Sequence, residues 1–204
     1  MIKLYAHSSS PYSQRASLLL EELKLEYKFI SVNFEQEEHK SDQFQILNPY
    51  GRVPCLEWNE IKISESLAIC RYLIARTEAF HLYPSNILER ALVDQWVDYT
   101  NIHLGLAFTN LAWQRYWCPL FGMTTDHQHA NRLEKRIKKE LPILEHQLTN
   151  RSYLLSESPT LCDFSFFPQI GVYDKAKISL EEYPKIMNWL KIMTKRDTWK
   201  ALLS

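Results

Sequence analysis

Two kinds of hydrophobic spacing alternate over about the first 76 residues. The apolar run at residues 2–6 is typical of a short buried strand. From Pro11 onward, apolar residues recur at three- and four-residue spacing, which predicts an amphipathic helix. Residues 27–34 alternate in polarity and are rich in aromatic and β-branched side chains, so we expect a second strand there.

The following stretch completes a first domain. The pattern predicts a short helix at residues 40–48, a β-hairpin formed by the runs at 53–58 and 61–64, and another helix at 64–77. The resulting order, β-α-β-α-β-β-α, combines strands and helices in a way that is typical of an α/β domain. We expect this domain to occupy residues 1–76.

Beyond a polar, proline-containing linker at residues 77–86, the pattern is helical almost throughout. We expect helices at 88–113, 129–150, 160–176, 183–196 and 197–204. The first of these has apolar residues close to helical spacing at Leu88, Leu92, Trp96 and Val97. The chain therefore predicts a second, all-helical domain at residues 87–204.

The composition excludes several functional classes. With 46% hydrophobic and 24% charged residues, the chain resembles an ordinary globular protein. Lysine and arginine together number 24, as do aspartate and glutamate, so the basic excess of a nucleic-acid-binding protein is missing. The apolar runs are too short and too interrupted for a membrane span. We therefore expect neither nucleic acid nor a membrane as a partner.

The cysteines and histidines form no metal or redox motif. No two of the four cysteines have the spacing of a redox pair or of metal ligands; they are Cys55, Cys70, Cys118 and Cys162. The sequence shows no secretory signal, so we expect buried, reduced thiols in a cytoplasmic protein. His127 and His129 lie close together without a third ligand nearby, and we expect no metal site.

The stretch HSSSPYSQR, residues 7–15, joins the first predicted strand to the first predicted helix. Thiol-disulfide proteins often place Cys-x-x-Cys at such a turn, and here Ser10 and Ser13 occupy the two cysteine positions. A serine cannot attack a disulfide as a cysteine does, but its hydroxyl can donate to a thiolate that a ligand brings. Helix capping is the ordinary role for Ser10, and Tyr12 is a competing hydroxyl in the same turn.

Activation of a ligand thiol at this turn requires only a modest stabilisation. A cysteine-like thiol has a pKa of about 8.5, so only about 3% of it is thiolate at neutral pH. Lowering the pKa by about two units requires roughly 2.7 kcal/mol of differential stabilisation. One hydroxyl donor and the positive end of a helix can together supply this amount.

A β-α-β-α-β-β-α domain followed by a helical domain resembles the cytosolic glutathione transferases, and the resemblance covers essentially the whole chain. The matching motifs are the Ser10 turn, NPYGRVPCLE at 48–57, ESLAICRYL at 65–73, and the capping-box pattern Thr160-x-x-Asp163. Among the serine-type phi, theta and zeta classes, the segments VNFEQEEHKS and LFGMTTDHQ are most similar to phi. The resemblance implies a thioredoxin-like first domain within a glutathione transferase fold.

The resemblance also implies where the thiol end of glutathione binds. Counting back from Arg15, which matches the family's arginine on the first helix, selects Ser10 as the catalytic hydroxyl. Val53, before a cis Pro54, would pair its backbone with the cysteinyl part of glutathione. Arg52 would contact a glutathione carboxylate, although a solvated surface charge is an equally ordinary role for it.

The two ends of glutathione have further implied partners. Ser66 would hold the γ-glutamyl carboxylate at a helix N-terminus, and Glu65 would bind the γ-glutamyl amine. The alternative is plain helix capping in this region, with Ser64 as the cap. Lys40 or His39 would meet the glycyl carboxylate, while a lysine among acidic neighbours is otherwise a solvated surface residue.

An aromatic-rich segment of the second domain is the candidate hydrophobic pocket. It contains Phe108, Trp113, Tyr116, Trp117 and Phe121. Rings at helical spacing commonly form a core, but so many within one short span also suit a site for a small apolar electrophile. Tyr50, in the NPYG turn, resembles the aromatic residue that some classes insert into the partner subunit, so we expect a homodimer.

The expected function is therefore that of a detoxifying glutathione transferase. It would activate the thiol of glutathione, its co-substrate, for attack on an apolar electrophile, and we expect it to need no cofactor. A glutathione-dependent isomerase or peroxidase is an alternative. A non-catalytic interaction module on the same fold is another alternative, and the absence of glutathione binding would favour it.

Overall fold

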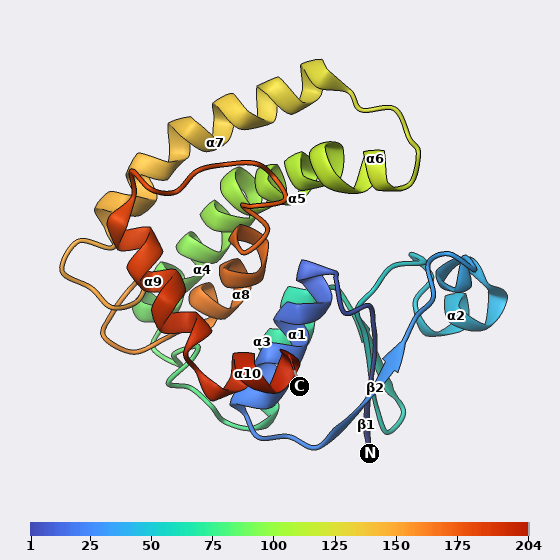
Figure 1. Cartoon of the computed structure of the whole chain (residues 1–204). Helices are drawn as coiled ribbons and strands as arrows, with labels where there is room; N and C mark the ends of the chain where they lie inside the picture. The colour runs from blue at the N-terminus through green and yellow to red at the C-terminus, as the bar shows by residue number, and fades with distance from the viewer. Residues whose placement is uncertain (204) are drawn as a thin grey trace. The chain divides into compact units, whose positions relative to one another are not determined.

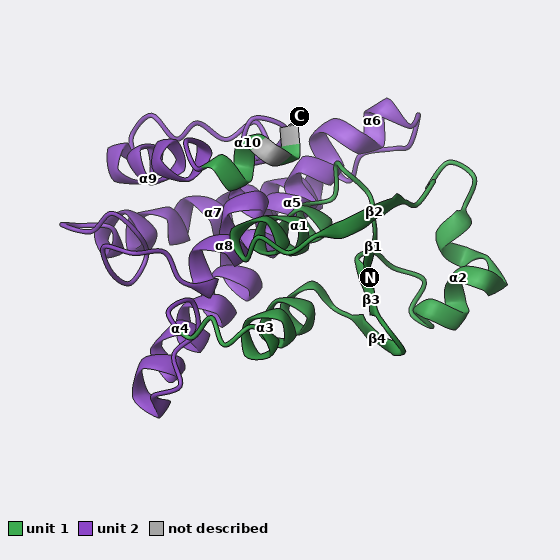
Figure 2. Cartoon of the chain, turned by 90° about the horizontal axis from the view of Figure 1, so that it is seen from below, with its two compact units in different colours: residues 1–80, 197–204 green, residues 81–196 purple. Residues whose placement is uncertain are grey.

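The structure, a computed structural model, describes residues 1–203, excluding the side chains of Ala201 and Leu203. The chain divides into two compact units (Figure 2). Unit 1 comprises residues 1–80 together with the helix at Asp197–Leu203, and unit 2 comprises His81–Arg196. Ser204, the last residue of the helix expected at 197–204, lies outside the described residues.

Unit 1 contains a mixed four-stranded sheet in the order β2-β1-β3-β4. The strands are β1 (Ile2–Ala6), β2 (Tyr27–Ser31), β3 (Cys55–Trp58) and β4 (Ile61–Ser64). Strand β1 pairs in parallel with β2 and antiparallel with β3, which forms the expected hairpin with β4. The hairpin turn places Asn59 at a φ of 58°, a left-handed conformation that asparagine adopts more readily than most residues.

The helices of unit 1 cover both sides of this sheet. Helices α1 (Pro11–Glu22) and α3 (Ser66–Arg76) lie on one side, and α2 (Asp42–Leu47) lies on the other (Figure 1). Leu4, Leu19, Leu56, Ile69 and Leu73 have no exposed surface, and burying each contributes about 1.5–3 kcal/mol. The predicted β-α-β-α-β-β-α order is confirmed, and this is the thioredoxin-like architecture expected from the resemblance.

Two further helical elements belong to unit 1. Helix α10 (Asp197–Leu203) packs against α1, although the whole of unit 2 separates them in sequence. A short 3₁₀ turn, η1 (Glu38–Lys40), precedes α2. Ser41 caps α2, because its Oγ accepts the backbone N–H of Phe44 at 3.2 Å.

Unit 2 is helical, as predicted, but its first long helix is interrupted twice. The elements in chain order are α4 (Ile87–Tyr99), η2 (Thr100–Gly105), α5 (Leu106–Ala112), η3 (Trp113–Trp117), α6 (Cys118–Leu120), α7 (His127–Gln147), α8 (Leu161–Ile170) and α9 (Pro184–Thr194). The segments η2 and η3 are π-helical: Leu106 N–H bonds Asn101 O, and Cys118 N–H bonds Trp113 O. The prediction of a single helix at 88–113 was therefore wrong, because η2 interrupts it and η3 begins at its last residue.

Local side chains explain the wider turns. Pro119, which follows η3, has no N–H to donate to the carbonyl of Gln114. That carbonyl instead accepts the hydroxyl of Thr125 at 2.9 Å. In η2, Thr100 Oγ1 and Asn101 Nδ2 donate to the carbonyls of Trp96 and Val97, each at 2.6 Å. The carbonyls of Trp96 and Val97 also accept the backbone N–H of Thr100, so these side chains add hydrogen bonds where the regular helix ends.

The buried face of α4 does not include all of its apolar residues. Leu88 and Leu92 are 71% and 44% exposed, whereas Val93 and Val97 are buried. The apolar spacing of this helix was correctly read as helical, but Leu88 and Leu92 do not belong to the core of unit 2.

The capping box at the start of α8 is confirmed and lies at the centre of unit 2. Thr160 N–H donates to Asp163 Oδ2 at 2.9 Å, and the side chain of Thr160 accepts in return. The other oxygen of Asp163 accepts from Leu154 N–H at 2.9 Å and from Trp189 Nε1 at 3.0 Å. Burial raises the pKa of this carboxyl, and these donors act against that shift.

Candidate functional site

Ser10 is the N-cap of α1. Its Oγ accepts the backbone N–H of Ser13 at 3.4 Å, and Pro11 occupies the first helical position. The hydroxyl of Ser13 is buried and accepts His7 N–H at 3.2 Å, so this second hydroxyl is committed to the turn. Ser10 is only partly buried. Because its oxygen accepts the capping bond, its O–H remains able to donate to a ligand.

A cleft of about 410 Å³ in unit 1 gathers most of the predicted glutathione-binding residues. Its lining consists of Tyr12, Asn48, Arg52, Val53, Pro54, Glu65 and Ser66. Five of these were expected from the sequence, from two segments that lie apart in the chain. Within the described residues, the lining includes neither Ser10 nor Lys40 nor His39, and Tyr12 is the lining residue from the turn at the start of α1.

The turn before β3 forms one wall of this cleft. The Val53–Pro54 peptide bond is cis, as the resemblance implied. Asn48, which the sequence analysis missed, is buried and donates from Nδ2 to Arg52 O at 2.5 Å. Gly51 has a φ of 60°, and a Cβ there would lie 3.0 Å from the carbonyl oxygen of His39. Asn48 is the asparagine of an Asn-Pro-x-Gly sequence, a turn signal that could have identified this support.

The opposite wall is the start of α3. The N-cap is Glu65, so Ser64 does not have the capping role that the alternative interpretation gave it. Glu65 has a φ of 67° without a side-chain capping bond, and such a backbone conformation costs of order 1–3 kcal/mol in a residue other than glycine. Strain of this kind persists where the surrounding structure determines it, and here it accompanies a carboxylate on the cleft wall.

Ser66 is supported from beneath by a buried cation. Arg15 Nη1 donates to Ser66 Oγ at 3.0 Å, and both residues are buried. Burial lowers the pKa of the Arg15 guanidinium to about 10, so it remains protonated at neutral pH. The positive end of α3 and this guanidinium together make the wall at Ser66 suitable for an anion.

The two candidates for the glycyl carboxylate lie on η1. Lys40 is exposed and forms a close ion pair with Glu37, and this hydrogen bond holds the pKa of Glu37 below its usual range. His39 packs edge-on against Phe34 at 4.8 Å between ring centroids, and Phe34 stacks on His7 at 4.7 Å. Phe34 therefore connects the loop of His39 to the turn that leads to Ser10.

The predicted aromatic residues of unit 2 separate into two groups. Phe108 has no exposed surface, so it is a core residue of unit 2 rather than an open pocket wall. Trp113 and Tyr116 are 42% and 44% exposed, and Trp117 is partly buried. Phe121 lies 6.2 Å from Trp113 between ring centroids. The exposed rings come from η3 and the residues directly after it.

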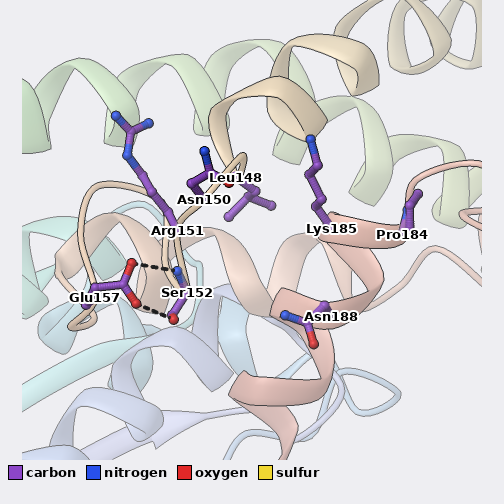
Figure 3. A pocket seen from close by; sticks show the side chains of 8 residues that line it. All are labelled: Leu148, Asn150, Arg151, Ser152, Glu157, Pro184, Lys185 and Asn188. Atoms are coloured by element: carbon purple, nitrogen blue, oxygen red, sulfur yellow. Dashed lines mark hydrogen bonds between the residues drawn. The ribbon is translucent and has the colours of Figure 1, made fainter.

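A further cleft, of about 390 Å³, lies in unit 2 between the end of α7 and the start of α9 (Figure 3). Its wall includes Ser152 and Glu157, which are joined by two hydrogen bonds at 2.5 and 3.3 Å. The N-terminus of α9 is already bonded by Glu145, whose carboxylate accepts the backbone N–H of Lys185 and of Ile186. None of the predicted site residues lines this cleft.

In the described part of the chain, no cluster of three or more His, Cys, Asp or Glu side chains is arranged to hold a metal ion. None of the described helices combines the length and the apolar character that crossing a membrane requires.

Comparisons with known proteins agree with this geometry. The model of the glutathione S-transferase N-terminal domain matches residues 1–75, and that of the C-terminal domain matches residues 100–197. Glutathione S-transferase 1 of Zea mays is 30% identical, with 97% of this chain and 93% of that protein covered. A glutathione S-transferase of Silene vulgaris is also 30% identical, with 100% and 97% covered.

Solved structures give the same result. Glutathione transferase F2 from Populus trichocarpa superimposes with a TM-score of 0.91 at 26% identity, covering 100% of this chain and 97% of that one. The chain therefore belongs to the glutathione S-transferase family. The predicted fold is confirmed, as is the leaning toward the plant phi-type members.

Proposed function

We propose that this protein is a glutathione transferase that binds glutathione in the cleft of unit 1 and activates its thiol with the hydroxyl of Ser10. The observation that carries the proposal is the cleft itself. Two segments that are separate in sequence, Arg52–Pro54 and Glu65–Ser66, form its walls together. These walls offer a cation, a backbone able to pair as a strand, a carboxylate, and a hydroxyl at a helix N-terminus. Groups of these kinds suit the carboxylates, the peptide backbone and the amine of a zwitterionic tripeptide.

The γ-glutamyl end suits the Glu65–Ser66 wall. The Ser66 hydroxyl and the first N–H groups of α3 donate to its carboxylate, and the buried Arg15 behind Ser66 adds positive potential. The Glu65 carboxylate lies on the same wall and pairs with the amine. The backbone of Val53 pairs with the cysteinyl part as an added strand would, and this directs the thiol toward the start of α1.

Ser10 stabilises the thiolate by donating its O–H while its oxygen keeps the capping bond from Ser13. The positive end of α1 acts in the same direction. With an aryl halide, the thiolate sulfur forms a bond to the ring carbon and halide leaves with the electron pair of the broken bond. The thiol proton is released to solvent. Tyr12, which lines the cleft, is the competing donor.

The decisive experiment is the pKa of the glutathione thiol bound to the protein, followed by thiolate ultraviolet absorbance over a pH series. The wild-type protein should lower it by about two units from about 8.5. Ser10→Ala should return it toward the free value, while Tyr12→Phe should leave it low. The reverse pattern would transfer the role to Tyr12. No binding at millimolar glutathione would indicate a non-catalytic module.

The second substrate and the assembly are part of the same proposal. A small apolar electrophile would bind at the exposed rings of Trp113, Tyr116 and Trp117, and the protein would act as a cytoplasmic homodimer. Tyr50 is 66% exposed and lines a third cleft together with Arg52 and Glu65, and this position suits a contact with a partner subunit beside the site. Sedimentation of the wild-type protein and of Tyr50→Ala would test this contact, because the variant should shift toward monomer.

A further inference from the structure

Lys175 lies over two aromatic rings of unit 2. Its Nζ is 5.6 Å from the ring centroid of Tyr116 and 5.2 Å from that of Trp117. The two rings are nearly perpendicular, with an interplanar angle of 87° and centroids 5.5 Å apart. The ammonium group is therefore within cation–π distance of two differently oriented rings, and each such contact contributes about 0.5–1 kcal/mol at a partly exposed site.

The backbone of unit 2 fixes this arrangement. Arg115, directly before Tyr116, donates from Nη1 to the carbonyl of Ala176 at 2.9 Å, and its Nη2 pairs closely with Glu134. This arginine thus holds the loop that carries Lys175 against η3, which carries the two rings. Tyr116 and Trp117 are the last two residues of the π-helical segment η3.

The charge of Lys175 is not neutralised by an ion pair. Among the residues that the structure describes, no carboxylate forms a salt bridge with its ammonium. The neighbouring Asp174 accepts the backbone N–H of Lys175 at 2.8 Å instead. The site therefore combines exposed aromatic surface, 42% at Trp113 and 44% at Tyr116, with a cation that lies over two ring faces and has no carboxylate partner among the described residues.

We infer that Lys175 makes this enzyme select aromatic electrophiles that carry a carboxylate or another anionic group. The inference rests on the proposed function and names the class of its second substrate. An arene packed against Tyr116 and Trp117 would bring an anionic substituent to the ammonium, where a charge-assisted hydrogen bond replaces part of the lost hydration. A neutral arene of the same shape gains only the packing.

The test uses two electrophiles that differ in one charge, 4-chloro-3,5-dinitrobenzoate and its methyl ester. Conjugation to glutathione is measured for the wild type, Lys175→Met, Lys175→Arg and Lys177→Met. Lys177 is an exposed lysine of the same loop and serves as the matched control for net charge. Each rate is corrected for the uncatalysed reaction of the same electrophile, because the two substrates differ in intrinsic reactivity.

Lys175→Met should raise the KM for the benzoate about tenfold, equivalent to about 1.4 kcal/mol, and leave the KM for the ester nearly unchanged. Lys175→Arg should retain the preference, and Lys177→Met should resemble the wild type. Equal changes for both electrophiles in Lys175→Met would overturn the inference and leave the lysine a structural role.

If the wild type conjugates neither electrophile, the proposed function fails. Equal binding of unreactive 3,5-dinitrobenzoate by wild type and Lys175→Met would then overturn the inference independently.

Discussion

Arg15 donates a hydrogen bond from Nη1 to the Oγ of Ser66 at 3.0 Å, and this bond joins the middle of α1 to the first residue of α3. Both side chains are buried. Because the serine oxygen accepts from the guanidinium, the serine O–H remains available to a ligand in the cleft. The wall proposed to hold the γ-glutamyl group is therefore anchored to the helix that begins next to Ser10.

Ser66→Ala should weaken both glutathione binding and the fold. The substitution removes the acceptor for one buried Arg15 donor, and leaving such a donor unsatisfied costs about 1–3 kcal/mol of the free energy of unfolding. The KM for glutathione should rise by about tenfold or more, as expected for a lost hydrogen bond to a charged group. Urea denaturation and steady-state kinetics measure the two effects. Ser64→Ala is the matched control, and an equal effect of that variant would contradict the role of Ser66.

Glu57 should make the stability of the sheet depend on pH. Lys3 Nζ donates to Glu57 Oε1 at 2.7 Å and Tyr5 O–H donates to Oε2 at 2.9 Å, and both hydrogen bonds hold the pKa of Glu57 below its ordinary 4.5. A carboxyl whose pKa is lower in the folded state stabilises the fold above its ordinary pKa. That contribution is lost as the pH falls through the folded-state value.

The free energy of unfolding should therefore be higher for the wild type than for Glu57→Gln at neutral pH. The difference should narrow as the pH falls below 4.5. Urea denaturation of both proteins over a series of pH values measures it. A difference that stays constant with pH would show that the charge of Glu57 does not contribute in this way.

Gly105→Ala should destabilise unit 2 through a single buried contact. A Cβ at this position would lie 2.2 Å from Oε1 of Gln169, which is itself 1% exposed and has little room to move. Overpacking of this kind typically costs about 1–3 kcal/mol. Shortening the partner in Gly105→Ala/Gln169→Ala should make the double variant less destabilised than the sum of the two single variants. Strict additivity in thermal or urea unfolding would rule out this contact as the cause.

The four cysteines should be nearly unreactive in the native protein. Cys55, Cys70, Cys118 and Cys162 are all free and buried, and burial raises the pKa of Cys70 to about 12 and that of Cys162 well above its ordinary value. A thiol with a raised pKa and no access presents little thiolate to a reagent. Titration with a disulfide reagent should be slow in buffer and should reach all four thiols in denaturant. Rapid modification of one thiol in buffer would contradict this.

Most of the fold follows from hydrophobic spacing. The strand at residues 2–6 was predicted from a short apolar run, and that at 27–34 from alternating polarity, whose period of two differs clearly from the helical period of 3.6. The hairpin at 55–64 was predicted from two short runs joined by a two-residue turn. The π-helical segments η2 and η3 were not predicted, because one extra residue in a turn shifts the apolar spacing too little to be recognised. The exposure of Leu88 depends on which neighbours α4 packs against, and spacing alone does not specify them.

The candidate site shows a similar division. Five residues of the cleft were predicted, because their segments match family motifs that lie at turns and helix starts. The positive φ of Glu65 was not foreseen, since glutamate carries no signal for that conformation as glycine would. The burial of Phe108 depends on tertiary packing, so its residue type alone could not reveal it. The pairing of Lys40 with Glu37 is local, three residues apart, and agrees with the alternative of an exposed lysine among acidic neighbours.

The return of α10 to unit 1 has a consequence for the order in which the chain folds. Helix α10 packs against α1, yet all of unit 2 is synthesised between them. The scaffold beneath Ser10 therefore lacks one of its packing partners until residues 197–203 have left the ribosome, whereas the residues of unit 2 are continuous in sequence. During translation, unit 2 can therefore fold before unit 1 is complete, because unit 1 needs residues 197–203 to finish its packing around α1.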